Sequence, residues 1–140
     1  INYYLGLLTD GAITTSFLAT SKTKKGDIRD KINLDVAIDD KHIDYRELSG
    51  GQKTLVNLAI MLSLRRLAST RRRLVPVMLF DEVFASLDSD YSMKVAGVLN
   101  DVSKEVSVFI VSHHPVLKDY TGSSISLSYE DKKTRITMPE

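Results

Sequence analysis

The chain has 140 residues, a length suited to one domain or to part of one, and a hydrophobic fraction of 43% that suffices for a core. Its formal net charge of +1 favours no class of charged partner, so any contact with nucleic acid must come from a local patch. The absence of cysteine excludes disulfides and thiolate metal sites, and no apolar run approaches the ~20 residues of a membrane span or forms a secretory signal.

The first third of the sequence predicts a helix followed by a small antiparallel meander. A helix is expected over residues 1–9, ended by Asp10-Gly11, and a strand rich in β-branched and aromatic residues is expected over residues 13–20. Strict alternation of apolar side chains predicts a second strand over residues 32–39. A short returning strand is expected over residues 42–47. The polar residues 21–31 predict an exposed loop between the first two strands.

The hexamer at residues 47–52, here called the signature segment, reads ELSGGQ and runs into an apolar helical pattern that predicts a helix over residues 50–68. Ser49 suits the N-cap, because its side-chain oxygen can accept from an otherwise unpaired N–H of the first turn. Gly50 and Gly51 leave the backbone bare, so an anion can approach the positive end of the helix. The hexamer alone allows either an ordinary capped helix or a phosphate site.

Basic residues gather at the far end of that helix and just beyond it. The segment holds five arginines in nine residues: Arg65, Arg66, Arg71, Arg72 and Arg73. Such a patch suits contact with the phosphates of DNA, and it is equally consistent with a solvated helix end and loop. The loop at residues 21–31, which holds five further basic residues, has the same two interpretations.

Residues 75–80 form a continuous apolar run, which predicts a central parallel strand buried on both faces. Asp81 and Glu82 follow directly, at the carboxyl end of the strand, where α/β sheets bind ligands. The sequence continues through Ser86 and Asp88, and Ser89-Asp90 is expected to cap the next helix.

A second strand should lie beside the first. The helix after Ser89-Asp90 and the apolar run at residues 106–111 complete a strand–helix–strand unit, whose strands should be parallel. His113 then emerges at the same edge of the sheet as Asp81 and Glu82, while His114 should point elsewhere. Residues 124–129 and 134–139 predict a final hairpin.

The sequence contains no phosphate-binding loop of the form G-x-x-x-x-G-K-[ST], since none of its seven glycines lies in that pattern. It therefore lacks the backbone cradle and the lysine that hold the β- and γ-phosphates of a nucleotide. The chain also begins at Ile1 rather than Met. We expect a part of a longer protein, with a complete nucleotide site formed only with another segment.

Three motifs in this order resemble those of ABC-type ATPases: LSGGQ as the signature, VPVMLFDEVFASLD as the Walker B strand with its D-loop, and SHH as the switch histidine. The resemblance is carried by residues 47–114. It is nearest to the SMC-like group, in which a long coiled coil separates the two halves of the head, and within it to the SbcC-type ATPase subunit of the double-strand-break repair exonuclease, especially its bacteriophage versions. Chromosome-organising SMC proteins are the alternative. Val83-Phe84, where transporter ATPases usually carry Pro-Thr, argues against a transporter, and Gln52 stands where many members carry Glu.

The resemblance implies an α/β fold. Residues 1–140 would be the C-terminal half of an ABC/P-loop-type ATPase head, with parallel strands and flanking helices, the small antiparallel meander and the C-terminal hairpin. Its partners would be the N-terminal half that carries Walker A, a second copy of the head joined through ATP, DNA and a nuclease subunit. A cytoplasmic or nucleoid location, or the cytoplasm of a host cell, would follow, with no membrane partner.

The resemblance also implies roles for individual residues. Asp81 would hold Mg²⁺ through a water, Glu82 would be the general base, and His113 would contact the γ-phosphate of ATP. The signature segment would bind the γ-phosphate held by the opposing head through Ser49, Gly50, Gly51 and Gln52. The D-loop residues that would couple the two sites are Ser86 and Asp88.

The implied activity is Mg²⁺-dependent ATP hydrolysis between two dimerised heads, which would regulate access of DNA to the nuclease. The isolated chain would be inactive, because it lacks Walker A. In the alternative, the same cycle would gate a DNA clamp in a chromosome-organising protein, and a transporter ATPase would be a third.

Overall fold

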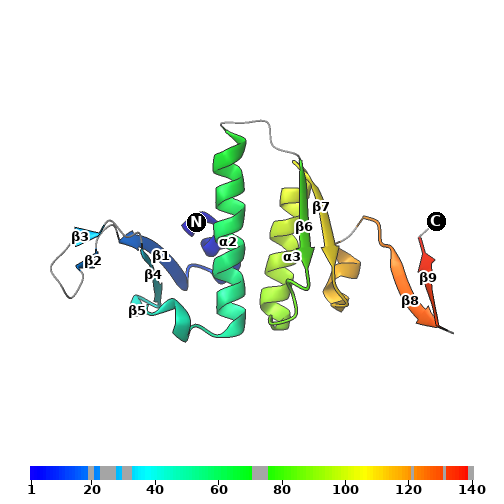
Figure 1. Ribbon diagram of the computed structural model, residues 1–140, viewed down its shortest axis with the longest axis horizontal. Coiled ribbons are helices and arrows are strands. Elements are labelled where there is room, and N and C mark those ends of the chain that lie inside the picture. Colours follow the sequence, from blue (N-terminus) through cyan, green and yellow to red (C-terminus); the bar gives the residue numbers. More distant parts are fainter. Residues whose placement is uncertain are drawn as a thin grey trace.

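The computed structural model describes residues 1–18, 21–22, 28–29, 33–70, 76–120, 122–130 and 132–138. Helix α2 (Gly50–Ser69) runs through the middle of the molecule (Figure 1). On one side of it lie helix α1 (Asn2–Thr9) and the antiparallel strands of the meander. On the other lie helix α3 (Ser89–Ser103) and a parallel pair of strands. The mixed α/β class predicted from the sequence is therefore confirmed.

The meander is an antiparallel sheet in the order β1-β4-β5, formed by β1 (Ile13–Leu18), β4 (Asn33–Ile38) and β5 (Lys41–Ile43). Two further short strands, β2 (Ser21–Lys22) and β3 (Ile28–Arg29), pair within the segment that was expected to be a loop.

The returning strand is shorter than predicted. Asp44 accepts a hydrogen bond from the Arg46 backbone N–H at 2.9 Å and caps the 3₁₀ turn η1 (Tyr45–Glu47). This side-chain cap competes with continuation of the strand, so the prediction of a strand through Glu47 is wrong.

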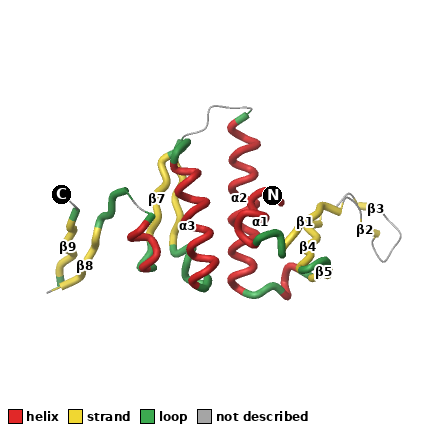
Figure 2. The backbone as a smooth tube through the Cα atoms, turned by 180° about the vertical axis from the view of Figure 1, so that it is seen from behind, coloured by secondary structure: helices red, strands yellow, loops and turns green. Residues whose placement is uncertain are grey.

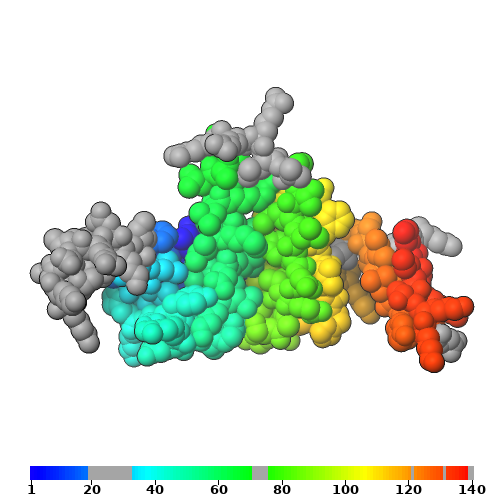
Figure 3. Space-filling view, viewed as in Figure 1, coloured from blue at the N-terminus to red at the C-terminus, as the bar shows by residue number. Residues whose placement is uncertain are grey.

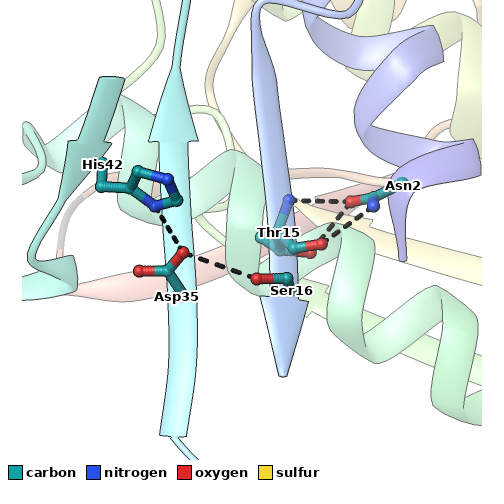
Figure 4. Close-up of polar contacts among 5 residues, drawn as sticks. All are labelled: Asn2, Thr15, Ser16, Asp35 and His42. Carbon is teal, nitrogen blue, oxygen red and sulfur yellow. Dashed lines mark hydrogen bonds and ion pairs between the residues drawn. The ribbon is translucent and has the colours of Figure 1, made fainter. Parts of the chain in front are cut away.

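Polar side chains fasten this sheet and the first helix together (Figure 4). The Asn2 side chain accepts from the Thr15 backbone N–H and donates to the Thr15 carbonyl, both at 2.9 Å, which ties α1 to β1. On the sheet, Ser16 from β1 and His42 from β5 both approach Asp35 Oδ2 on β4, at 3.5 and 2.6 Å. The hydroxyl faces the carboxylate rather than the imidazole, so this cluster orders three strands and is not arranged as a nucleophile with its base.

The core joins the three helices to strands of both sheets, with Ile13 and Val36 from the meander and Phe80 from the parallel pair. Helix α1 contacts both α2 and α3, and the buried side chains of α2 follow the predicted apolar stripe. Among the fully or almost fully buried residues are Leu5, Leu8, Leu55, Leu62, Phe80, Phe84, Val95 and Leu99. Burying apolar side chains of this size contributes about 1.5–3 kcal/mol each relative to exposure, so this cluster holds α2 and α3 in place.

Strands β6 (Val77–Asp81) and β7 (Ser107–Val111) pair in parallel from Val77 opposite Ser107 to Asp81 opposite Val111, as predicted. The expectation that the first of them is buried on both faces is wrong. Met78 and Phe80 face the core, whereas Leu79 on the opposite face is 74% exposed. The core of this chain covers one face of the pair and leaves the other open.

The last two strands form the predicted hairpin, β8 (Ser126–Glu130) and β9 (Lys133–Thr137). It follows the 3₁₀ turn η2 (Pro115–Asp119) and stands out from the end of the body in the space-filling view (Figure 3). All its described side chains are exposed, so its apolar residues find no cover within the described part of the chain. Among the described residues, no helix is long and apolar enough to cross a membrane.

Candidate nucleotide site

The candidate residues lie at the ends of four elements, and these ends lie together at one end of the molecule. The N-termini of α2 and α3 and the carboxyl ends of β6 and β7 all lie at the lower end in Figures 1 and 2. The arrangement follows from the parallel pairing, because the helix after β6 returns the chain so that both strands end on the same edge. The signature segment, Asp81, Glu82 and His113 thus share one end of the fold.

A complete capping box begins α2. The Gln52 backbone N–H donates to Ser49 Oγ at 3.2 Å, and the Gln52 side chain accepts from the Ser49 backbone N–H at 2.9 Å. Gln52 therefore performs the reciprocal role that Glu plays in such boxes. The Ser49 hydroxyl, which accepts here, retains a hydrogen that it can donate to an anion at the helix N-terminus.

The residues before the signature segment are held by short polar contacts. Arg46 Nε donates to Asp44 Oδ1 at 3.0 Å, and this hydrogen-bonded guanidinium keeps the pKa of the Asp44 carboxyl well below its usual range. Lys53 from the first turn of α2 reaches back to the Arg46 carbonyl at 2.9 Å. These contacts fix the direction in which the chain enters the helix.

Strand β6 ends because Glu82 adopts a left-handed backbone with φ of 49°. Its backbone N–H still donates to the Val111 carbonyl at 2.8 Å, and its carbonyl accepts from Ala85 N at 3.0 Å to begin a turn. The left-handed region costs a side-chain-bearing residue about 1–2 kcal/mol. Strain at a glutamate that ends a strand is of the kind that gathers at functional sites.

The turn places Glu82 beside His113. Glu82 Oε1 lies 3.3 Å from His113 Nδ1, and the two side chains are 43% and 88% exposed. The structure thus brings together the carboxylate and the imidazole that were predicted to share this edge. A carboxylate and an imidazole in contact, both accessible to solvent, can accept or hold a proton at a bound phosphate or water.

Asp81 is exposed at the end of β6, opposite Val111. No group of three or more acidic, histidine or cysteine residues that could hold a metal occurs in the described part of the chain. Magnesium is commonly held by one or two carboxylates together with phosphate oxygens and waters, so a single accessible Asp81 fits this ion when a nucleotide supplies the remaining ligands.

Residues 85–88 lie between the end of β6 and the start of α3, and they contact the N-terminal end of α2. Asp88 accepts from the Tyr91 backbone N–H at 2.9 Å and is the N-cap of α3, so the expectation that Ser89-Asp90 would cap this helix is wrong. Asp88 has the extended backbone of a cap, while Ser89 and Asp90 are already helical. Such a cap contributes about 1 kcal/mol. The Ser86 hydroxyl lies 2.8 Å from Thr54 Oγ1 on α2, a contact that no local sequence pattern predicts.

The two neighbouring histidines have separate environments, as the sequence suggested. His114 lies with its ring 5.7 Å from that of buried Phe84, its Nδ1 accepts from the Val116 N–H at 3.3 Å, and its Nε2 lies 3.4 Å from the hydroxyl of buried Ser92. His114 thus anchors the segment that carries His113.

Arg65 and Arg66 of the arginine-rich segment lie toward the other end of α2. Arg65 is about 24 Å along the helix from Ser49, at a rise of about 1.5 Å per residue. The guanidinium of Arg66 lies over the Tyr3 ring at 5.5 Å from its centroid. Arg71, Arg72 and Arg73 lie outside the described residues. The structure therefore separates Arg65 and Arg66 from the candidate nucleotide edge.

This fold is that of an SMC ATPase head. A solved structure from work on ATP-driven dimerization and DNA-stimulated activation of SMC ATPases is similar, with a TM-score of 0.77 and 18% sequence identity. The match covers 99% of this chain and 80% of the chain in that structure. The chain itself matches the family described as the RecF/RecN/SMC N terminal domain over residues 14–135, and it belongs to that family.

Curated relatives include chromosome proteins. The chain is 34% identical to structural maintenance of chromosomes protein 3 of Dictyostelium discoideum over 86 residues, which are 60% of this chain and 6% of that protein. It is 30% identical to the chromosome partition protein Smc of Aquifex aeolicus over 98 residues, 69% of this chain and 8% of that protein. The chain thus spans less than a tenth of the length of these relatives.

Proposed function

We propose that this chain is the C-terminal lobe of an SMC-type ATPase head, which closes on ATP against a second head and gates the passage of DNA. The observation that carries the proposal is the gathering of the Ser49-capped helix and the Glu82–His113 pair at one end of the fold. The similarity to chromosome-organising proteins favours the DNA clamp over the control of a nuclease.

The residues divide the work of phosphoryl transfer to water. Glu82 orients the attacking water and takes its proton, and His113 donates a hydrogen bond to the γ-phosphate. Asp81 would hold Mg²⁺, and this ion would supply charge neutralisation on the phosphates. Ser49, Gly50, Gly51 and Gln52 present the N-terminus of α2 to the γ-phosphate of ATP on the opposing head. Ser86 and Asp88 couple the two ATP sites across the interface between the heads.

An open apolar face supports the proposal that another segment of the protein packs against this chain. Leu79, Phe109 and Val111 are 74%, 56% and 58% exposed on the uncovered face of the parallel strands. An apolar face of this kind marks a surface for protein contact. We assign it to the Walker A half of the same head, which would also supply the phosphate cradle. The isolated chain is then expected to have no ATPase activity.

The proposal is tested on the full-length protein with ATP and Mg²⁺. We expect ATP hydrolysis, measured as phosphate release. We also expect ATP to join two heads, measured by light scattering as an increase in molecular mass. A full-length protein that neither hydrolyses ATP nor changes its assembly with ATP would overturn the proposal.

Control of a nuclease remains the second candidate, because the sequence from Phe80 to Asp88, FDEVFASLD, resembles that of SbcC-type ATPases. The two candidates differ in the middle of the coiled coil of the full-length protein. A globular hinge domain there indicates the chromosome-organising type. A Cys-x-x-Cys hook or a short apex indicates the nuclease type.

DNA contact is assigned to the arginine segment formed by Arg65, Arg66, Arg71, Arg72 and Arg73. Replacing Arg71, Arg72 and Arg73 with Ala in the full-length protein should weaken DNA binding and lower the slope of log affinity against log salt by up to about 0.9 for each phosphate that is no longer neutralised. A charge-matched control replaces Lys132, Lys133 and Arg135 on the exposed hairpin. If the two triple variants bind DNA equally and with equal salt dependence, the arginine segment is a solvated loop and does not contact DNA.

A further inference from the structure

Two hydroxyl groups connect the signature helix to the turn that follows Glu82. Thr54 Oγ1 donates to the Gly50 carbonyl at 3.1 Å and lies 2.8 Å from Ser86 Oγ. A threonine hydroxyl has one hydrogen, and here it is directed to Gly50. Ser86 is therefore the donor between the two hydroxyls, and Thr54 relays the contact to the first turn of α2.

The backbones also meet at this point. A Cβ atom on Gly51 would lie 2.8 Å from the Ser86 carbonyl oxygen, which is closer than side-chain carbons approach a backbone atom, and one on Gly50 would lie 3.7 Å from Ser86 Cβ. The absence of a side chain at Gly51 thus allows the turn to sit against the helix N-terminus. The hydroxyl pair and the close backbone contact hold the same two segments together.

The path from Ser86 back to Glu82 is short and internally bonded. The Glu82 carbonyl accepts from Ala85 N at 3.0 Å, and the Phe84 carbonyl accepts from Leu87 N at 3.1 Å. Phe84 between them is 1% exposed and anchors the turn in the core. A displacement of Ser86 therefore moves a stiff turn whose other end is the left-handed backbone of Glu82.

We propose that Thr54 is a positioning residue that couples the N-terminus of α2 to Glu82 through Ser86. Contact of the helix N-terminus with the γ-phosphate on the opposing head is relayed by this hydroxyl pair to the turn that aims Glu82. The inference rests on the proposed function and adds to it the link by which closure of the two heads reaches the general base. Thr54 touches neither nucleotide nor water in this scheme, so its effect is on turnover rather than on binding.

The test replaces Thr54 with Val in the full-length protein, which retains the branched shape and removes the hydroxyl. We expect kcat for ATP to fall about fivefold to tenfold, the loss expected for one hydrogen bond, while KM and ATP-driven dimerisation change less than about twofold. Ser86→Ala should likewise lower kcat while KM and ATP-driven dimerisation change little. The double variant should be no slower than either single variant, because both remove one contact. Thr54→Ser, which restores the hydroxyl, should recover most of the turnover.

A control separates the proposed link from a local effect on the helix. Ser63 on α2 donates to the Ala59 carbonyl at 2.7 Å, the same type of bond that Thr54 makes to Gly50. Ser63→Ala therefore loses such a bond far from Ser86 and should leave kcat unchanged. Wild-type kcat in Thr54→Val, or additive losses in the double variant, would overturn the coupling while leaving the ATPase proposal intact. If the wild-type protein does not hydrolyse ATP, both proposals fail together.

Discussion

Replacing Glu82 with Gln in the full-length protein is expected to lower kcat for ATP hydrolysis by about 10²–10⁴-fold, the usual contribution of a general base. The amide keeps the size and hydrogen-bonding reach of the carboxylate but cannot take a proton from water. ATP-driven dimerisation should persist, because the N-terminus of α2 and its Ser49 cap are unchanged. Phosphate release and light scattering on the same sample measure the two quantities.

Glu105 offers a matched control for this substitution. It is exposed just beyond the end of α3, away from the nucleotide edge, and Glu105→Gln makes the same chemical change. We expect wild-type turnover from that variant. Normal hydrolysis by Glu82→Gln would show that Glu82 is not the base, and loss of ATP-driven dimerisation would show that it acts in assembly instead.

Replacing Gly51 with Ala should disturb both stability and nucleotide response. The added Cβ would lie 2.8 Å from the Ser86 carbonyl oxygen, so the turn or the helix N-terminus must shift. Overpacking of this kind typically costs about 1–3 kcal/mol of the free energy of unfolding. We expect a lower melting temperature, together with weaker ATP-driven dimerisation and slower hydrolysis in the full-length protein.

Gly97 in α3 is the matched control, because a Cβ there would meet nothing within 4 Å. Gly97→Ala should stabilise the protein by about 0.5–1 kcal/mol, since alanine is the better helix former. The two substitutions therefore have opposite expected signs in thermal unfolding. If Gly51→Ala is as stable as Gly97→Ala and dimerises normally with ATP, the close contact between α2 and the turn contributes neither to stability nor to dimerisation.

The three helices and the longer strands, with their order, could be predicted from the amino-acid sequence alone, whereas β2, β3 and the 3₁₀ turn at Tyr45–Glu47 could not. The ELSGGQ segment predicted the start of α2 at Gly50, because a capping serine and helical periodicity are local properties that neighbouring residues reveal. The strand–helix–strand spacing predicted the parallel pairing, and with it the meeting of Glu82 and His113, because parallel strands end on the same edge. Periodicity alone did not distinguish a strand covered on one face from one covered on both, as Leu79 demonstrates.

The polar groups that meet across long sequence separations were visible only in the folded chain. Thr54 and Ser86 are 32 positions apart and Ser92 and His114 are 22 apart, and neither pair belongs to a local pattern. That Asp88 rather than Ser89 caps α3 likewise depended on where the turn after Glu82 places the start of this helix. Local sequence sets helix and strand periods, whereas such contacts depend on how the packed core of the three helices with β1, β4 and β6 positions the ends of these elements.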